Sequence, residues 1–139
     1  MKILIDDADL EKIREIYGVY SVDGVTTNPT ILAKTGKPPF EILKGIREYI
    51  GQEAELHVQV VAGYAEGMLE DARRILKELG ENTYIKVPVT REGLKAIKAL
   101  KMEGVNVTAT AVYTRMQAFL AGKAGADYTA PYVNRKIGR

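Results

Sequence analysis

Lys86 is the residue whose type and surroundings point most clearly to covalent chemistry. It lies between Ile85 and Val87 and shortly before Pro88, in the segment YIKVPV. A lysine in such an apolar run points into the interior or lies at a sheet edge. Burial disfavours the charged ammonium form, and the neutral amine can attack a carbonyl carbon to form a Schiff base. The structural alternative is a lysine whose aliphatic stem packs in the sheet while its ammonium group reaches solvent.

Polar side chains also stand at or near the carboxyl ends of the other predicted strands. Barrel enzymes and open α/β enzymes build their sites at this end of a parallel sheet. This shared placement favours a site role for Lys86 over the structural alternative. The candidates on the other strands are Asp6, Thr26, Thr27, Asn28, Gln59, Thr108, Thr110 and Tyr132.

The first candidates each have a structural alternative. Asp6 lies beside Asp7 and Asp9 at the start of a predicted helix, where an aspartate can cap the helix. Asn28 precedes Pro29, and asparagine before proline is common in turns without any ligand. Both interpretations stay open for these two residues.

The later candidates also have structural alternatives. Gln59 and Thr110 could be core polar groups with satisfied hydrogen bonds. Tyr132 could be a packed aromatic ring with a solvated hydroxyl group. His57 alternates with Gln59 on one strand face and is interpreted as structural, or as partly exposed at the start of the strand. We assign His57 no role in a reaction.

Alternating strands and helices must position these side chains. Short apolar, β-branched runs are each followed by a turn and by a segment with apolar residues three or four apart. The strand centres are roughly 20 to 35 residues apart, which is typical of right-handed βα units in a parallel sheet. We therefore predict an α/β fold. The predicted strands are 2–6, 22–27, 55–61, 83–87, 105–111 and 126–133.

Glycine, proline and threonine mark the limits of the predicted helices. A glycine after a helical run permits the left-handed turn that ends a helix, which is the role predicted for Gly80, Gly104 and Gly125. Pro38 and Pro39 are predicted to begin the second helix. Thr90 is the predicted N-cap of the fourth.

The composition limits the possible functions. The 139 residues are 46% hydrophobic and 27% charged, which is typical of one globular domain. Without cysteine and with a single histidine, the chain can form neither a disulfide nor a zinc site of the Cys/His kind, so we predict chemistry without a metal. A net charge of +2, spread evenly, argues against nucleic-acid binding.

The absence of several patterns narrows the prediction further. No apolar run approaches the roughly 20 residues of a membrane span, and the acidic start does not resemble a signal peptide, so we predict a cytoplasmic protein without a membrane partner. The dinucleotide, P-loop and serine-hydrolase motifs are also missing from the sequence. A small-molecule substrate is the remaining expectation.

Several segments spread over nearly the whole chain carry a family resemblance. They are ILID, DGVTTNP, QV, AEGM, IKVPVTREGLKAIKAL, TAVY, QA, AGAD and APYVNR. Together they resemble the small transaldolase-like proteins, and within these the fructose-6-phosphate aldolases. The resemblance implies a (β/α)8 TIM barrel, a class I aldolase mechanism, no metal or organic cofactor, and assembly into homo-oligomers.

The resemblance also implies roles for the residues around the Schiff base. Lys86 corresponds to the lysine that attacks the ketone carbonyl of a ketose such as fructose 6-phosphate or dihydroxyacetone. Asp6 would contact the sugar hydroxyl that loses its proton as the carbon–carbon bond breaks. Thr26 and Asn28 would hold the hydroxyl groups of the substrate.

Further roles concern water and phosphate. The resemblance implies that Gln59, Thr110 and Tyr132 hold a water during dehydration of the carbinolamine, with Tyr132 as the acid and base. Arg135 resembles the arginine that meets the substrate's phosphate group. The pairing of Gln59 with Tyr132 favours the aldolase branch, because true transaldolases typically have a glutamate and a phenylalanine at these places.

The end of the sequence departs from the family pattern. After APYVNR the family continues into two further βα units, whereas this sequence reads KIGR. We therefore expect one domain, residues 1–139, truncated after the sixth strand, with exposed strand edges. The leading prediction is an aldolase that cleaves fructose 6-phosphate, or forms it from dihydroxyacetone and glyceraldehyde 3-phosphate.

Three alternatives stay open beside the aldolase. The first is a transaldolase that transfers a dihydroxyacetone unit between sugar phosphates. The second is a catalytically silent truncated barrel that only binds sugar phosphate or oligomerises. The third is an open doubly wound binding module, which the missing phosphate-binding loops disfavour.

Overall fold

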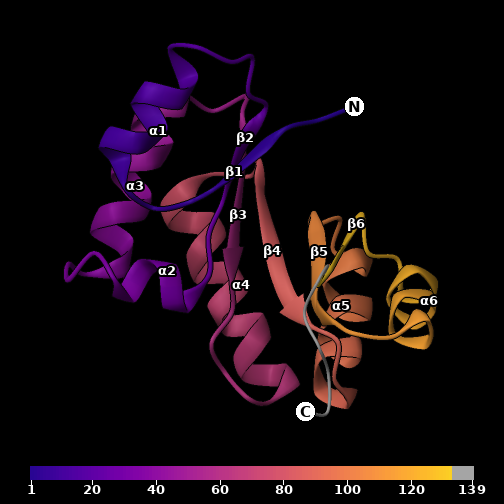
Figure 1. Cartoon of the computed structure of the whole chain (residues 1–139). Coiled ribbons are helices and arrows are strands. Elements are labelled where there is room, and N and C mark those ends of the chain that lie inside the picture. The colour runs from indigo at the N-terminus through magenta and orange to yellow at the C-terminus, as the bar shows by residue number, and fades with distance from the viewer. Residues whose placement is uncertain (133–139) are drawn as a thin grey trace. The chain divides into compact units, whose positions relative to one another are not determined.

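Strands and helices alternate along the computed structural model, which describes residues 1–132 (Figure 1). The strands are β1 (Leu4–Asp6), β2 (Gly24–Thr26), β3 (Glu55–Gln59), β4 (Thr83–Pro88), β5 (Val107–Val112) and β6 (Tyr128–Pro131). The helices are α1 (Leu10–Tyr17), α2 (Pro29–Ala33), α3 (Pro39–Ile50), α4 (Ala65–Leu79), α5 (Arg91–Met102) and α6 (Arg115–Ala124). The chain divides into two compact units, one of residues 1–59 and 74–84, the other of residues 60–73 and 85 onward.

The first unit holds β1, β2 and β3 as parallel neighbours, followed by the first residues of β4. The middle residues of the three strands, Ile5, Val25 and Leu56, are in register and buried. Helices α1 and α3 pack against each other, and the Tyr17 ring meets the Tyr49 ring edge-on at 5.7 Å. The core of this unit is therefore a parallel sheet covered by amphipathic helices.

A buried arginine ties the helices of the first unit together. Arg47 of α3 is 4% exposed, and it donates to the carbonyl oxygens of Leu79 (2.9 Å), Gly51 (2.9 Å), Ala54 (2.7 Å) and Asn82 (3.1 Å). It also donates to the Thr83 hydroxyl at 3.1 Å. Burial lowers the pKa of Arg47. The guanidinium group thus links the end of α3 to the end of α4 and the start of β4.

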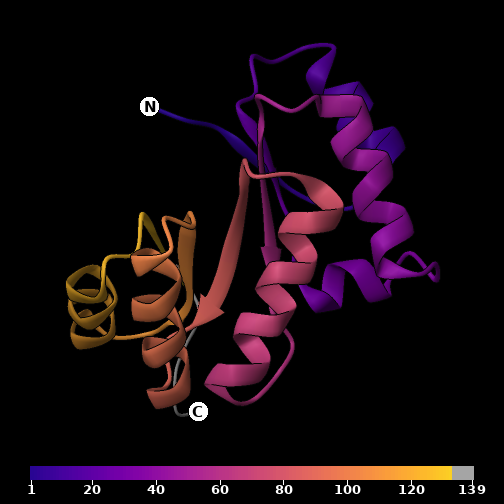
Figure 2. The ribbon, with the colours of Figure 1, turned by 180° about the vertical axis from the view of Figure 1, so that it is seen from behind.

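The second unit holds the rest of β4 with β5 and β6, again parallel and in chain order. Ile85 and Val87 of β4 and Val107 and Ala109 of β5 are fully buried. Helices α5 and α6 lie side by side in both views (Figure 2). The register of β5 with β6 shifts between Ala109 and Val112, which marks a bulge near the carboxyl end of β5.

The predicted alternation and the α/β class are confirmed, and the strands are shorter than expected except β4, which extends one residue further, to Pro88. The first strand begins at Leu4 because the N–H of Ile3 donates to the Asp23 carboxylate at 2.7 Å. The third strand was expected to reach Val61 but ends at Gln59, and the N–H of Val61 donates to the Asp71 carboxylate at 2.9 Å. At both positions a side-chain carboxylate takes the place of the backbone carbonyl that would accept the hydrogen bond in a β-sheet.

The predicted helix limits are largely confirmed. Thr90 caps α5 by accepting from the N–H of Gly93, and Gly125 follows α6 with a left-handed φ of 103°. Pro39 begins α3 as predicted, but α3 is the third helix, because the short helix α2 precedes it.

Candidate active site

The first unit carries predicted site residues at the carboxyl ends of its strands. Asp6 ends β1 and is the register partner of Thr26, which ends β2. Thr26 is in turn the register partner of His57, two residues before Gln59 at the end of β3. Side chains two apart on a strand share a face, so Asp6, Thr26 and Gln59 face the same side of this sheet.

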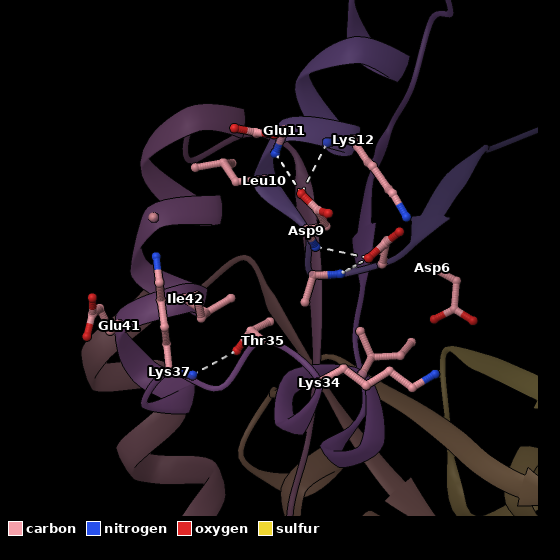
Figure 3. A pocket seen from close by; sticks show the side chains of 14 residues that line it. Asp6, Asp9, Leu10, Glu11, Lys12, Lys34, Thr35, Lys37, Glu41 and Ile42 are labelled. Atoms are coloured by element: carbon pink, nitrogen blue, oxygen red, sulfur yellow. Dashed lines mark hydrogen bonds between the residues drawn. The ribbon is translucent and has the colours of Figure 1, made fainter.

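The helix-cap alternative for Asp6 is wrong. Asp9 is the N-cap of α1, accepting from the N–H groups of Glu11 (3.0 Å) and Lys12 (3.4 Å). Asp7 accepts from the N–H groups that follow it. Figure 3 shows the carboxylate of Asp6 apart from this hydrogen-bonded turn, on an open pocket of about 880 Å³. An exposed carboxylate at a strand end is available to accept a proton from a ligand.

Asn28 has the local role that its position before proline suggested. It is the N-cap of α2, and its Oδ1 accepts from the N–H of Ile31 at 2.9 Å. The cap fixes the side chain at the carboxyl end of β2. Its amide nitrogen is therefore the part of Asn28 that can donate to a bound molecule.

The second unit holds Lys86, which is 7% exposed within β4. Lys86 is the register partner of Thr108, and Pro88 is the register partner of Thr110. Lys86 and Thr110 therefore lie on the same face of neighbouring strands, and Thr110 is likewise 7% exposed. The interior placement predicted for Lys86 is confirmed, because the side chain is buried and β4 is not an edge strand.

Tyr132 follows β6 and is 44% exposed. Its backbone N–H donates to the carbonyl of Val112 at 3.1 Å, and its ring stacks on Tyr113 at 4.9 Å. Tyr132 is thus tied to the same end of β5 as Thr110. The remaining predicted residue, Arg135, lies outside the described residues.

A buried acid and histidine form a polar pair that sequence reasoning did not predict. Glu55 and His57 are 4% and 1% exposed, and they share the face of β3 that carries Gln59. Since an ionised carboxylate only accepts, His57 Nε2 donates to Glu55 Oε1 (3.0 Å), and Lys2 bonds the other oxygen. Burial raises the pKa of Glu55, but the hydrogen bonds from Lys2 and His57 hold it below its usual value. In the sequence, Glu55 and His57 are two residues apart in ELHVQ, which places both side chains on one face of the strand and could have indicated this pair.

Replacing Glu55 with glutamine is expected to lower the free energy of unfolding at pH 7 by about 1–3 kcal/mol. His57 and Lys2 then lose their ionised acceptor. Because the pKa of Glu55 is lower in the folded state, its contribution is fully present above the unfolded value of about 4.3. It is lost as the pH falls through the folded value. Urea unfolding of wild type and variant at several pH values measures this difference.

The matched control is Glu15→Gln, at an exposed acid of α1 in the same unit. This change is expected to alter the unfolding free energy by less than about 0.5 kcal/mol. A difference between wild type and Glu55→Gln that stays constant between neutral and acidic pH would contradict the assignment.

Two structural features bear on ligands and membranes. Within residues 1–132, no cluster of three or more histidine, aspartate or glutamate side chains is arranged to hold a metal ion. Over the same residues, no helix has the length and apolar character needed to cross a membrane.

Comparison with known proteins places the chain in a family. The model of the family described as transaldolase/fructose-6-phosphate aldolase matches residues 3–137. The chain belongs to this family. A probable fructose-6-phosphate aldolase of Streptococcus pneumoniae is 48% identical over 136 residues. Probable transaldolases of Aquifex aeolicus and Methanococcus maripaludis are 44% and 42% identical over 135 residues.

Coverage of these transaldolase-family relatives is unequal. Each alignment covers 97% of this chain but 61% of the relative, so the chain spans about three fifths of the relatives' length. A crystal structure of an enolase from Bradyrhizobium, complexed with magnesium and mandelic acid, matches with a TM-score of 0.63 and 16% identity. That match covers 94% of this chain and 38% of the enolase chain. It shows the fold alone, and it confirms the predicted barrel class, of which residues 1–132 form six strands.

Proposed function

We propose that this chain performs a class I aldolase reaction that cleaves fructose 6-phosphate to dihydroxyacetone and glyceraldehyde 3-phosphate, or forms it from them. The observation that carries the proposal is the burial of Lys86 on the face that it shares with Thr110. The 48% identity to a probable fructose-6-phosphate aldolase supports the substrate class. Independence of metals, homo-oligomeric assembly and a cytoplasmic location stay predictions.

The proposed reaction begins on Lys86. Its neutral amine attacks the C2 ketone carbon of the sugar, and loss of water from the carbinolamine gives an iminium ion. Thr110, Tyr132 and Gln59 would hold the water that carries protons in this step, with Tyr132 as acid and base. The step requires the neutral amine of Lys86, a residue that is 7% exposed.

Carbon–carbon cleavage is assigned to Asp6. Its carboxylate accepts the proton of the C4 hydroxyl as the C3–C4 bond breaks, and the electron pair moves to C3 with the iminium as electron sink. Glyceraldehyde 3-phosphate leaves, and a proton then adds to C3. Water hydrolyses the iminium to release dihydroxyacetone and restore the amine. Thr26 and Asn28 would bind hydroxyl groups, and Arg135 the phosphate.

Transaldolase activity is the second candidate, because the relatives from Aquifex and Methanococcus are named probable transaldolases. The two reactions differ in the fate of the three-carbon unit. An aldolase releases free dihydroxyacetone, whereas a transaldolase passes the unit to an aldose phosphate. Incubation of the chain with fructose 6-phosphate, with and without a four-carbon aldose phosphate, separates them. Free dihydroxyacetone without an acceptor supports the aldolase, and a seven-carbon ketose product without free dihydroxyacetone supports the transaldolase.

Replacing Tyr132 with phenylalanine is expected to slow release of dihydroxyacetone by about 10²-fold or more, the usual contribution of an acid and base. The ring, and with it the stacking on Tyr113, is retained, so the loss would come from the hydroxyl group. Steady-state assay of dihydroxyacetone measures the effect. Tyr64→Phe, at a residue 76% exposed in the same unit, is the control and should match wild type. Equal rates for Tyr132→Phe and wild type would remove Tyr132 from the mechanism.

A further inference from the structure

The carboxyl end of β5 has an unusual backbone next to Thr110. Ala111 has a φ of 55°, the only positive φ of a non-glycine residue among those that the structure describes. The register shift between Ala109 and Val112 coincides with it. A left-handed alanine in a bulge costs free energy and persists only where neighbouring groups hold it. Some contact must therefore stabilise the backbone that follows Thr110.

The Gln117 side chain supplies that contact from α6. Its Oε1 accepts from the N–H groups of Tyr113 (2.8 Å) and Thr114 (3.1 Å). Its Nε2 donates to the carbonyl oxygens of Ala111 and Val89, each at 3.3 Å. A capping box needs only the acceptor half of such a side chain, and a glutamate serves there equally well. The two carbonyl contacts require a donor, which an ionised carboxylate lacks.

These contacts join the segments that carry the proposed machinery. Val89 lies three residues after Lys86, and its N–H donates to the carbonyl of Thr110 at 3.0 Å. Tyr113, held through its N–H, carries the ring that stacks on Tyr132. One amide thus contacts the segment after β4, the bulge after Thr110 and the residue that supports Tyr132.

We propose that Gln117 is a positioning residue that holds Thr110 and Tyr132 in the geometry needed for carbinolamine dehydration on Lys86. It acts through the bulge at Ala111 and through Tyr113, without touching the substrate. The inference rests on the proposed aldolase function. It adds a residue of α6 whose amide is required as both donor and acceptor.

The first test compares Gln117→Glu with wild type. Glutamate keeps the acceptor for Tyr113 and Thr114 but directs a carboxylate at two carbonyl oxygens. We expect kcat to fall by about 10–100-fold, as a small misplacement of reacting groups does, while KM changes little. A protonated carboxyl group regains a donor, so the ratio of variant to wild-type kcat should rise as the pH falls towards about 5. A structural role alone would not produce this recovery.

Thr114→Ala is the matched control. Thr114 Oγ accepts from the N–H of Gln117 at 3.1 Å, so its loss removes a cap of the same helix. It leaves the Gln117 contacts to Ala111 and Val89 in place. The Thr114 hydroxyl also donates a longer hydrogen bond to Gln117 Oε1 (3.4 Å), but that oxygen keeps the N–H groups of Tyr113 and Thr114. We therefore expect a lower melting temperature from loss of the cap, with kcat within about twofold of wild type. A loss of kcat equal to that of Gln117→Glu would overturn the positioning role.

A second measurement does not depend on activity. In Gln117→Ala, amide hydrogen exchange at Val89 and Tyr113 should accelerate relative to amides of α5, because the contacts that join the two strand ends are gone. Unchanged exchange at both amides would overturn the inference whether or not the chain is active. If wild type forms no Schiff base but exchange accelerates in Gln117→Ala, the aldolase proposal fails, whereas the role of Gln117 in holding the bulge at Ala111 is supported. If wild type is active and Gln117→Glu keeps its kcat and pH profile, the inference fails alone.

Discussion

Borohydride reduction of the chain in the presence of dihydroxyacetone is expected to leave a stable adduct on Lys86, and Lys86→Met is expected to leave none. Reduction converts the iminium into a secondary amine that survives mass spectrometry. The site is buried, and methionine has nearly the same length without the amine, so the core should accept it. Cleavage of fructose 6-phosphate should fall on the order of 10⁴-fold or more, as on removal of a nucleophile.

Lys98→Met is the matched control for this experiment. Lys98 is an exposed lysine of α5 in the same unit as Lys86. Its replacement should leave both the adduct and the rate unchanged. An adduct that persists in Lys86→Met would assign the Schiff base to another amine. No adduct in wild type at saturating dihydroxyacetone would reject Schiff-base chemistry for this chain. The remaining alternative would be the catalytically silent barrel that only binds sugar phosphate or oligomerises.

Gly93→Ala is expected to destabilise the protein by about 1–3 kcal/mol, the range for overpacking a closely packed site. A Cβ at Gly93 would lie 1.7 Å from the carbonyl oxygen of Pro88 and 3.1 Å from Thr90 Oγ1. A backbone oxygen cannot rotate away, so the first turn of α5 must separate from the end of β4. Because Pro88 is two residues from Lys86, the rate of Schiff-base formation should fall as well.

Gly122→Ala, in the same unit, is expected to change stability in the opposite direction. Gly122 lies within α6, and a Cβ there would meet no atom within 4 Å. Alanine at this position should therefore stabilise the helix by up to about 1 kcal/mol. Thermal and urea unfolding of both variants measure the two effects. Destabilisation of equal size at Gly93 and Gly122 would mean that close approach to Pro88 is not the cause.

The sequence pattern predicted those parts of the fold that depend on local periodicity. Apolar runs and glycine positions were sufficient to place the strands of residues 1–132, and a threonine at a helix start was sufficient for the cap at Thr90. The strand limits were less predictable, because Asp23 and Asp71 bond backbone groups far from them in the chain. Such tertiary hydrogen bonds leave no periodic signal.

The candidate site was predictable where residue type alone was informative. A lysine in an apolar run and polar groups at strand ends indicated Lys86 and Thr110. The Glu55–His57 pair was missed because His57 was compared only with Gln59, and Glu55 was not considered as its partner. Gln117 was missed because a glutamine at a helix start resembles an ordinary cap, and its contacts to Val89 and Ala111 depend on a bulge that the pattern does not reveal.

The hydrogen-bond acceptors of Arg47 determine how the first unit responds to salt and to acid. Its hydrogen bonds go to four carbonyl oxygens and one hydroxyl group, none of which titrates as a carboxylate does. Added salt screens exposed pairs such as Lys44–Glu78, but it has little effect on a buried cation bonded to fixed dipoles. The connection between α3 and the end of α4 should therefore outlast the ion pairs of the surface, both in concentrated salt and in acid.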